Sequence, residues 1–274
     1  IGFLFIYLFG REHLLYWVSA PEDAHLSPWL DSGLMLARNL GAQLLFYIIA
    51  LYYFGLGLSR DISPQDREQS PSWRRGLLAM VSSIGKDQSD AFIEDRLYRL
   101  SPIVLLTAAL ANTFLAWDFG MMLVAHYHST VFPMYFILGN MYGGAGLLLI
   151  VSAIMFRFVP VRELIDTTKV RSMGVLMTGF LLLWIYMFWA QFFVSWYGNL
   201  PHEYGVLKTQ MYGHYGPVFW AMIFCNTFIP LGCLLFVKVK TTWWSMVAVA
   251  TIVNGGIWLN RYIIVMPALS EDHS

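Results

Sequence analysis

The sequence predicts an all-α integral membrane protein, a polytopic helical bundle with six full membrane spans and one partial span. The first observation is composition, because 58% of the residues are hydrophobic and only 12% are charged. In an average globular chain about 25% of the residues are charged. The second is the length of the apolar runs, most of which reach the roughly 20 residues that cross a hydrocarbon core. The third is a formal net charge of zero, which argues against nucleic acid as a partner.

Seven apolar runs follow one another along the chain. Residues 1–10 are too short to cross a bilayer, and we expect them to be the end of a helix. A polar segment, residues 59–100, separates the first two full runs. The six predicted spans are residues 30–58, 101–124, 131–158, 173–197, 216–237 and 242–266.

The distribution of Lys and Arg predicts the orientation of these spans. Residues 59–100, 157–171 and 238–240 hold thirteen of the 17 basic residues, and they alternate onto one face. An excess of Lys and Arg marks the cytoplasmic side of a membrane protein. The other face then receives residues 10–29, 125–130 and 198–215 and the C-terminal tail, on or near which all seven histidines fall.

The stretch Trp117–Phe136 combines a carboxylate, Asp118, with two imidazoles, His126 and His128, at a predicted membrane boundary. With a rise of about 1.5 Å per residue, Asp118 lies one turn below the outer interface. An ionisable group at that depth is costly and is a functional-site hypothesis by default. The alternative is a structural acid that pairs with a neighbouring arginine.

Other polar residues and glycines on the spans predict helix contacts. Arg38 lies about 12 Å below the outer end of its helix, and Arg261 lies near the outer end of the last span. Each arginine is expected either to pair with an acid or to extend its charge to the interface. Residues 196–203 predict a helix-ending turn and an acidic loop. Amides expected to hydrogen-bond between helices are Gln191, Asn226, Asn254 and Asn260. Glycines that predict close packing are Gly139, Gly143, Gly144, Gly146, Gly255 and Gly256.

Metal and redox centres bound by this chain are disfavoured. His126 and His128 are two residues apart, which suits a loop that presents one ring inward, and the sequence offers no third metal ligand beside them. No histidine lies deep in a span, where a membrane haem would need it. The two cysteines, Cys225 and Cys233, are too few for an iron–sulfur cluster, which usually takes four. We therefore expect no metal, haem or cluster in this chain.

Several motifs resemble those of the polysulfide reductase membrane-subunit (NrfD-type) family over about residues 10–266. Within that family they are most similar to the larger quinol-oxidising membrane subunit of alternative complex III. The run from His128 to Phe136, HSTVFPMYF, is the most specific of them. The others are Trp117–Phe119, Trp196–Glu203, Cys225–Asn226 and Asn254–Tyr262.

The resemblance implies a fold of two four-helix bundles and quinol binding near the outer face of the first. Residues 1–127 would then supply the later helices of the first bundle, and residues 128–274 the second bundle and an outer tail. The implied partners are an extracytoplasmic iron–sulfur protein, c-type cytochrome subunits and a second homologous membrane subunit. The implied location is the bacterial cytoplasmic membrane, and menaquinol is the expected substrate.

Quinol chemistry also suits the candidate residues themselves. A carboxylate removed from water and a histidine that titrates near neutral pH can accept two protons in turn. We predict Asp118, His128 and His13 as catalytic proton acceptors. The predicted quinone-binding residues are Arg11, Arg38, Asn112, His126 and Trp117. Relatives carry an Asp at the position of His13 and a His at the position of Asn112.

Other functions remain open at this point. The chain could be a non-catalytic membrane anchor of the same kind of complex, or a subunit that reduces quinone instead of oxidising quinol. A secondary transporter is less favoured, because the polar groups cluster at the outer side and the sequence shows no internal repeat.

Overall fold

The computed structural model describes residues 15–18, 28–61, 72–84, 89–123, 129–156, 166–199 and 201–270. These residues are almost entirely helical and contain no strand, which confirms the predicted all-α class. Six helical segments in the described chain are long and apolar enough to cross a membrane. They are Ser32–Arg60, Asp90–Met121, Phe132–Met155, Thr167–Gly198, Gly213–Leu234 and Trp243–Pro267.

The chain packs as two compact units. The smaller unit is Leu26–Phe114, and the larger unit combines Ile1–His25 with Leu115–Ser274. The predicted division at 127/128 stays a prediction, because a packing unit is defined by contacts and the predicted halves by the bundle to which each helix belongs.

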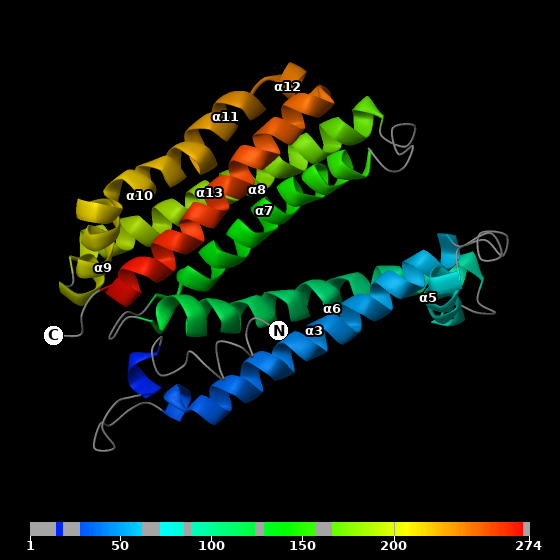
Figure 1. Cartoon of the computed structure of the whole chain (residues 1–274), viewed down its shortest axis with the longest axis horizontal. Coiled ribbons are helices and arrows are strands. Elements are labelled where there is room, and N and C mark those ends of the chain that lie inside the picture. Colours follow the sequence, from blue (N-terminus) through cyan, green and yellow to red (C-terminus); the bar gives the residue numbers. More distant parts are fainter. Residues whose placement is uncertain are drawn as a thin grey trace. The chain divides into compact units, whose positions relative to one another are not determined.

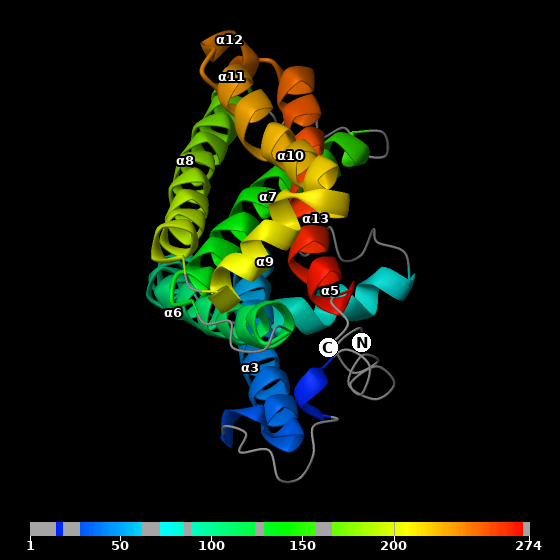
Figure 2. The same ribbon diagram turned by 90° about the vertical axis from the view of Figure 1, so that its left-hand side faces the viewer.

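The smaller unit contains helix α3 (Ser32–Asp61), helix α5 (Ser72–Ile84) and most of helix α6 (Asp90–Ala116). The polar segment predicted over 59–100 is therefore partly helical. The first turns of α6 lie before the apolar run and carry an exposed Asp95–Arg99 ion pair of 2.9 Å, whose spacing of four residues favours helix. Figures 1 and 2 show α5 crossing the end of α3, where Ile84 packs against Gly55.

The larger unit holds four membrane-spanning segments that pack side by side (Figure 1). They are α7 (Phe132–Met155), α8 (Thr167–Gly198), the broken helix α10–η7–α11 (Gly216–Leu234) and α13 (Trp243–Ser270). Two short helices, α9 (Pro201–Met211) and α12 (Val237–Thr241), lie at opposite ends of this bundle (Figure 1). The loop predicted after the turn at 196–203 is thus mostly helical. The turn itself is present at Asn199 (φ 45°), and Pro201 suits the first position of a helix.

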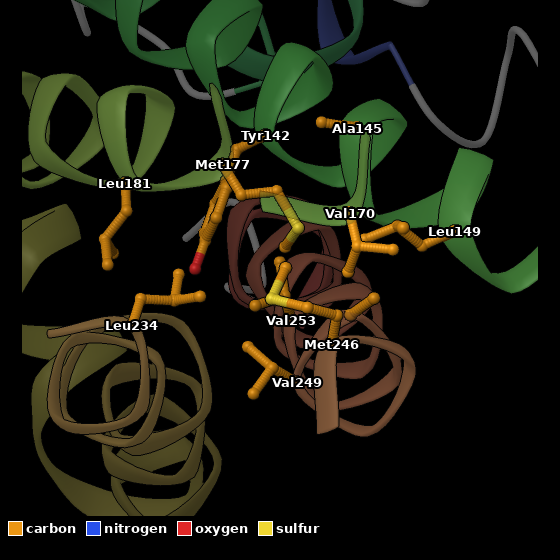
Figure 3. Packing of buried hydrophobic residues seen from close by; sticks show 11 residues of the cluster. Tyr142, Ala145, Leu149, Val170, Met177, Leu181, Leu234, Met246, Val249 and Val253 are labelled. Carbon is orange, nitrogen blue, oxygen red and sulfur yellow. The ribbon is translucent and has the colours of Figure 1, made fainter. Parts of the chain in front are cut away.

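Apolar side chains from all four spans fill the middle of this bundle (Figure 3). Met177 and Leu181 of α8, Leu234 of α11 and Met246 of α13 are fully buried there. Towards the α9 end the core becomes aromatic, since the ring of Trp184 lies 5.8 Å from that of Tyr135 and 5.2 Å from that of Phe188.

The glycine-rich face of α7 packs closely on α13, as the sequence predicts for part of its glycines. A Cβ atom on Gly146 would lie 2.6 Å from Nδ2 of Asn254 and 3.4 Å from the carbonyl oxygen of Ala250. Gly144 was wrongly included in this surface, because a Cβ atom there would meet nothing within 4 Å. The two positions lie two residues apart and so point to different sides of the helix.

Within the larger unit, segments that the charge distribution assigns to the same membrane face lie at the same end of the bundle. Gly174 of α8 packs against Lys240 of α12, and the rings of Phe156 and Trp243 lie 4.7 Å apart at that same end. At the other end, Ser129 contacts Gln191 near the end of α8. Residues 166–172 and 238–241 therefore share one end, and the start of α7 lies at the end where α8 finishes.

Candidate functional site

The helix that carries Asp118 ends in a π-turn. Regular α-helix stops at Ala116, and η4 (Trp117–Met121) continues it with a 2.8 Å hydrogen bond from the Met122 N–H to the Trp117 carbonyl oxygen, five residues back. The sequence predicts ordinary helix to residue 124, so this is a local correction. Single π-turns inside helices frequently occur at functional sites.

The π-turn packs against α7 and α13 within the larger unit. Gly120 makes this approach possible, because a Cβ atom there would lie 2.7 Å from the ring of Phe132. Asp118 is 1% exposed. The carboxyl group is therefore enclosed by the protein, while its predicted depth in the membrane stays a prediction.

A cavity of about 440 Å³ lies beside the π-turn. Its volume falls within the roughly 300–1,000 Å³ of small-molecule sites. The π-turn, the segment before α7 and the last turns of α8 supply its walls. The lining residues are Trp117, Met121, Ser129, Thr130, Val131, Gln191, Val194 and Ser195.

The polar part of the cavity wall is built around Gln191. The hydroxyl of Ser129 donates a 2.6 Å hydrogen bond to Oε1 of Gln191, and the hydroxyl of Ser195 donates to the Gln191 carbonyl oxygen at 3.2 Å. The backbone N–H of Ser129 donates to the sulfur of Met121 at 3.3 Å. Gln191 and Ser195 are each only 6% exposed. These contacts join the π-turn, the start of α7 and the end of α8 into one wall.

The rest of the wall is apolar and partly open. Val194 is 57% exposed and Thr130 is exposed as well, so the cavity meets the outside of the bundle on that side. Trp117 and Met121 lie about one helical turn apart in the part of the wall that the π-turn supplies. A largely apolar ligand with a few polar atoms suits such a wall.

The predicted site residues fall in three groups. Trp117 lines the cavity, and Asp118 belongs to the same π-turn without being one of the lining residues. Arg11, His13, His126 and His128 lie outside the described residues.

Arg38 and Asn112 belong to the smaller unit, and their predicted quinone contacts stay a prediction. Nη1 of Arg38 donates a 2.7 Å hydrogen bond to the carbonyl oxygen of Trp29, and its Cζ atom lies 4.1 Å from the centroid of the Trp29 ring. Nδ2 of Asn112 donates to the carbonyl oxygen of Ala108 at 2.8 Å. In both residues these hydrogen bonds run to nearby backbone.

Sequence reasoning missed Gln191 and Ser195 as site residues. Gln191 was predicted only as an interhelical hydrogen-bonding amide, a role that its contact with Ser129 fulfils. A usable signal was present, because Gln191 and Ser195 are four residues apart and so share a helix face. Ser129 and Thr130 also belong to the motif HSTVFPMYF.

A second polar cluster joins α13 to α7. Nη2 of Arg261 donates to the carbonyl oxygen of Phe136 at 3.0 Å and to Oδ1 of Asn140 at 2.8 Å, and its Cζ atom lies 3.7 Å from the centroid of the Phe136 ring. Nδ2 of Asn260 donates to the hydroxyl of Tyr135. Within the described residues Arg261 has no acid partner, and its contacts are uncharged groups. Asn140 is exposed, so the expectation of a charge that extends towards the surface stays a prediction.

Among the residues that the structure describes, no group of three or more His, Cys, Asp or Glu side chains could hold a metal ion. The site is thus defined by the cavity, its amide and hydroxyl groups, and the buried carboxyl group of the π-turn.

Comparison with known proteins identifies the family. The sequence model of the family described as "Polysulphide reductase, NrfD" matches residues 30–270. No curated protein matches the chain at a significant level. Members of the matched family are membrane subunits of oxidoreductases. Because the match covers most of the chain and six described helices can span a membrane, this protein is a multi-pass membrane member of the NrfD family.

Proposed function

We propose that this chain is the quinol-binding membrane subunit of a respiratory or photosynthetic oxidoreductase in a bacterial cytoplasmic membrane. It binds quinol, with menaquinol as the expected form, at the outer end of its spans and releases the protons there. The electrons pass to an extracytoplasmic iron–sulfur or haem partner, as in alternative complex III. The observation that carries this proposal is the cavity beside the π-turn of Asp118.

The cavity fits the chemistry of a quinol. A quinol has a flat ring with two hydroxyl groups and an apolar tail, so it needs an apolar slot with few polar contacts. Trp117, Met121 and Val194 supply apolar wall, and Gln191 and Ser129 supply hydrogen-bonding groups. The exposed side at Val194 gives a tail a route towards lipid.

Oxidation of one quinol breaks two O–H bonds and yields a quinone, two protons and two electrons. Asp118, which lies buried directly after the cavity residue Trp117, accepts one proton as a general base. A histidine, His128 or His13, accepts the other. The iron–sulfur or haem centres of the partner take the two electrons one at a time.

A second candidate is a non-catalytic membrane anchor of the same kind of complex. Two observations favour it, because Asp118 is buried and does not line the cavity. Both are expected of an acid whose role is purely structural. A structural Asp118 would pair with another group and hold the helices together. The two candidates differ in what happens when the acid is neutralised.

The test is Asp118→Asn in the purified complex, which keeps the shape of the side chain and removes the base. Loss of a general base costs about 10²–10⁴ in rate, so oxidation of 2,3-dimethyl-1,4-naphthoquinol with ferricyanide as acceptor falls by that factor while the yield of complex is retained. Asp95→Asn, an exposed acid of α6, is the control and leaves turnover unchanged. Normal turnover per assembled Asp118→Asn complex, or poor assembly alone, favours the anchor.

A further inference from the structure

We infer that Gln191, positioned by Ser129, is the hydrogen-bond donor that binds a ring oxygen of the quinone in the cavity. This inference rests on the proposed function and adds the residue that orients the substrate. The family motifs identified in the sequence do not include Gln191.

The contact with Ser129 decides which end of the amide the ligand meets. The carboxamide has one oxygen acceptor and one nitrogen with two N–H donors. The oxygen accepts the 2.6 Å hydrogen bond from Ser129, which fixes the plane of the amide, and the nitrogen is the end that can donate to a ligand oxygen. A quinone oxygen is an acceptor and a quinol oxygen can accept as well, so N–H donors suit both forms.

Ser129 is itself held in place from two sides. Its backbone N–H donates to the sulfur of Met121 in the π-turn, and its hydroxyl donates to Gln191 of α8. A shift of the π-turn therefore moves Ser129, and with it the Gln191 amide. The position of the Gln191 amide is therefore coupled, through Ser129, to the turn that carries Asp118.

The other polar groups of the wall are less suited to this role. The hydroxyl of Ser195 donates to the carbonyl oxygen of Gln191 in its own helix, at 3.2 Å. Thr130 lies on the exposed side of the cavity. Gln191 combines burial, a fixed amide oxygen and a place in the cavity wall.

The experiment measures KM and kcat for 2,3-dimethyl-1,4-naphthoquinol in the purified complex. Loss of one hydrogen bond to a buried ligand raises KM about tenfold, which we expect for Gln191→Leu and for Gln191→Glu, since a carboxylate has no N–H. Ser129→Ala raises KM by less, because the donor remains and only its orientation is lost. In all three variants kcat changes much less than KM, which a purely structural defect would not produce.

The matched controls are Gln210→Leu on α9 and Ser152→Ala on α7, whose hydroxyl donates to Leu148 in its own helix. Neither residue lines the cavity, and both variants keep the wild-type KM. An unchanged KM in Gln191→Leu overturns the inference.

A second measurement works on the unaltered complex and does not depend on how well variants assemble. A photoreactive azidonaphthoquinone is expected to label peptides that contain residues 129–131 or 191–195. Labelling confined to other segments of this chain overturns the inference while leaving quinol binding intact. If the complex neither binds nor oxidises the quinol, the proposed function itself fails.

Discussion

Arg261 illustrates how one charged side chain is accommodated inside a membrane bundle. Its guanidinium group donates to the Phe136 carbonyl and to Asn140 and lies over the Phe136 ring, so α13 is joined to α7 by contacts that need no acid. Gly139 leaves room for it, since a Cβ atom there would lie 3.0 Å from Nη2. The arginine therefore has a structural role in the described part of the chain.

Arg261→Met is expected to destabilise the protein. Hydrogen bonds to a charged group contribute about 1.5–3 kcal/mol each, and the substitution leaves the Phe136 carbonyl and the Asn140 amide without that donor. Arg261→Lys recovers only part of the loss, because a single ammonium cannot reproduce the planar fork. The measurement is the midpoint of thermal unfolding of the detergent-solubilised complex. Arg171→Met, on an exposed position of α8, is the control, and an equal effect in both variants contradicts the assignment.

At the scale of elements, two of the spans are interrupted by π-turns. In η7 (Phe224–Phe228) the cause is local, because Pro230 has no N–H to continue the ladder and the Ile229 N–H donates to the Phe224 carbonyl instead. Asn226 of this turn is fully buried against Gly256 of α13. In η4 the missing side chain of Gly120 allows the turn to pack against the ring of Phe132. Both turns pack on α13, which makes this helix the common support of the larger unit.

Close packing of α7 on α13 predicts opposite results for two neighbouring glycines. Gly146→Ala lowers stability by roughly 1–3 kcal/mol, the range for inserting a group into a packed interior, because the new methyl group meets Asn254 and the Ala250 carbonyl. Gly144→Ala leaves stability unchanged or slightly higher, since its methyl group meets nothing within 4 Å. The midpoints of thermal unfolding of the two variant complexes check this prediction. Equal midpoints would show that α7 and α13 can move apart to accept the methyl group at little cost.

At the scale of the whole molecule, the larger unit separates its two ends chemically. The end with α12 carries Lys238 and Lys240, and Gly174 of α8 packs beside Lys240. The end with α9 carries the cavity and the start of α7. Basic residues favour the cytoplasmic side, so we expect the cavity end to face outwards.

Labelling of single cysteines tests this orientation. In a variant without Cys225 and Cys233, a membrane-impermeant maleimide applied to spheroplasts is expected to label Tyr212→Cys, at an exposed position beside α9. It labels Ser172→Cys, at the exposed start of α8, only after the membrane is disrupted. The reverse pattern would invert the topology and move the cavity to the cytoplasmic side.

Composition and the apolar runs were enough to predict the all-α membrane class, and the described part of the chain contains six helices of spanning length. An apolar run of span length forms a helix, because inside the bilayer every N–H and C=O group must be paired within the segment. The depth of Asp118 along its helix could be predicted from residue number, but its burial depends on the packing of the π-turn against α7 and α13. The motif HSTVFPMYF pointed to the family that the comparison confirms.

The position and lining of the cavity follow from helix packing and could not be read from the sequence. Ser129 and Gln191 are 62 residues apart, and their contact depends on how α8 packs beside the start of α7. The π-turn aims Trp117 and Met121 at the cavity and leaves Asp118 out of its wall, although the three residues lie within five positions. Helix packing similarly separates Gly146, which faces α13, from Gly144, which does not. Such choices depend on the angle between neighbouring helices, which arises from contacts between distant residues and leaves no mark in a local pattern.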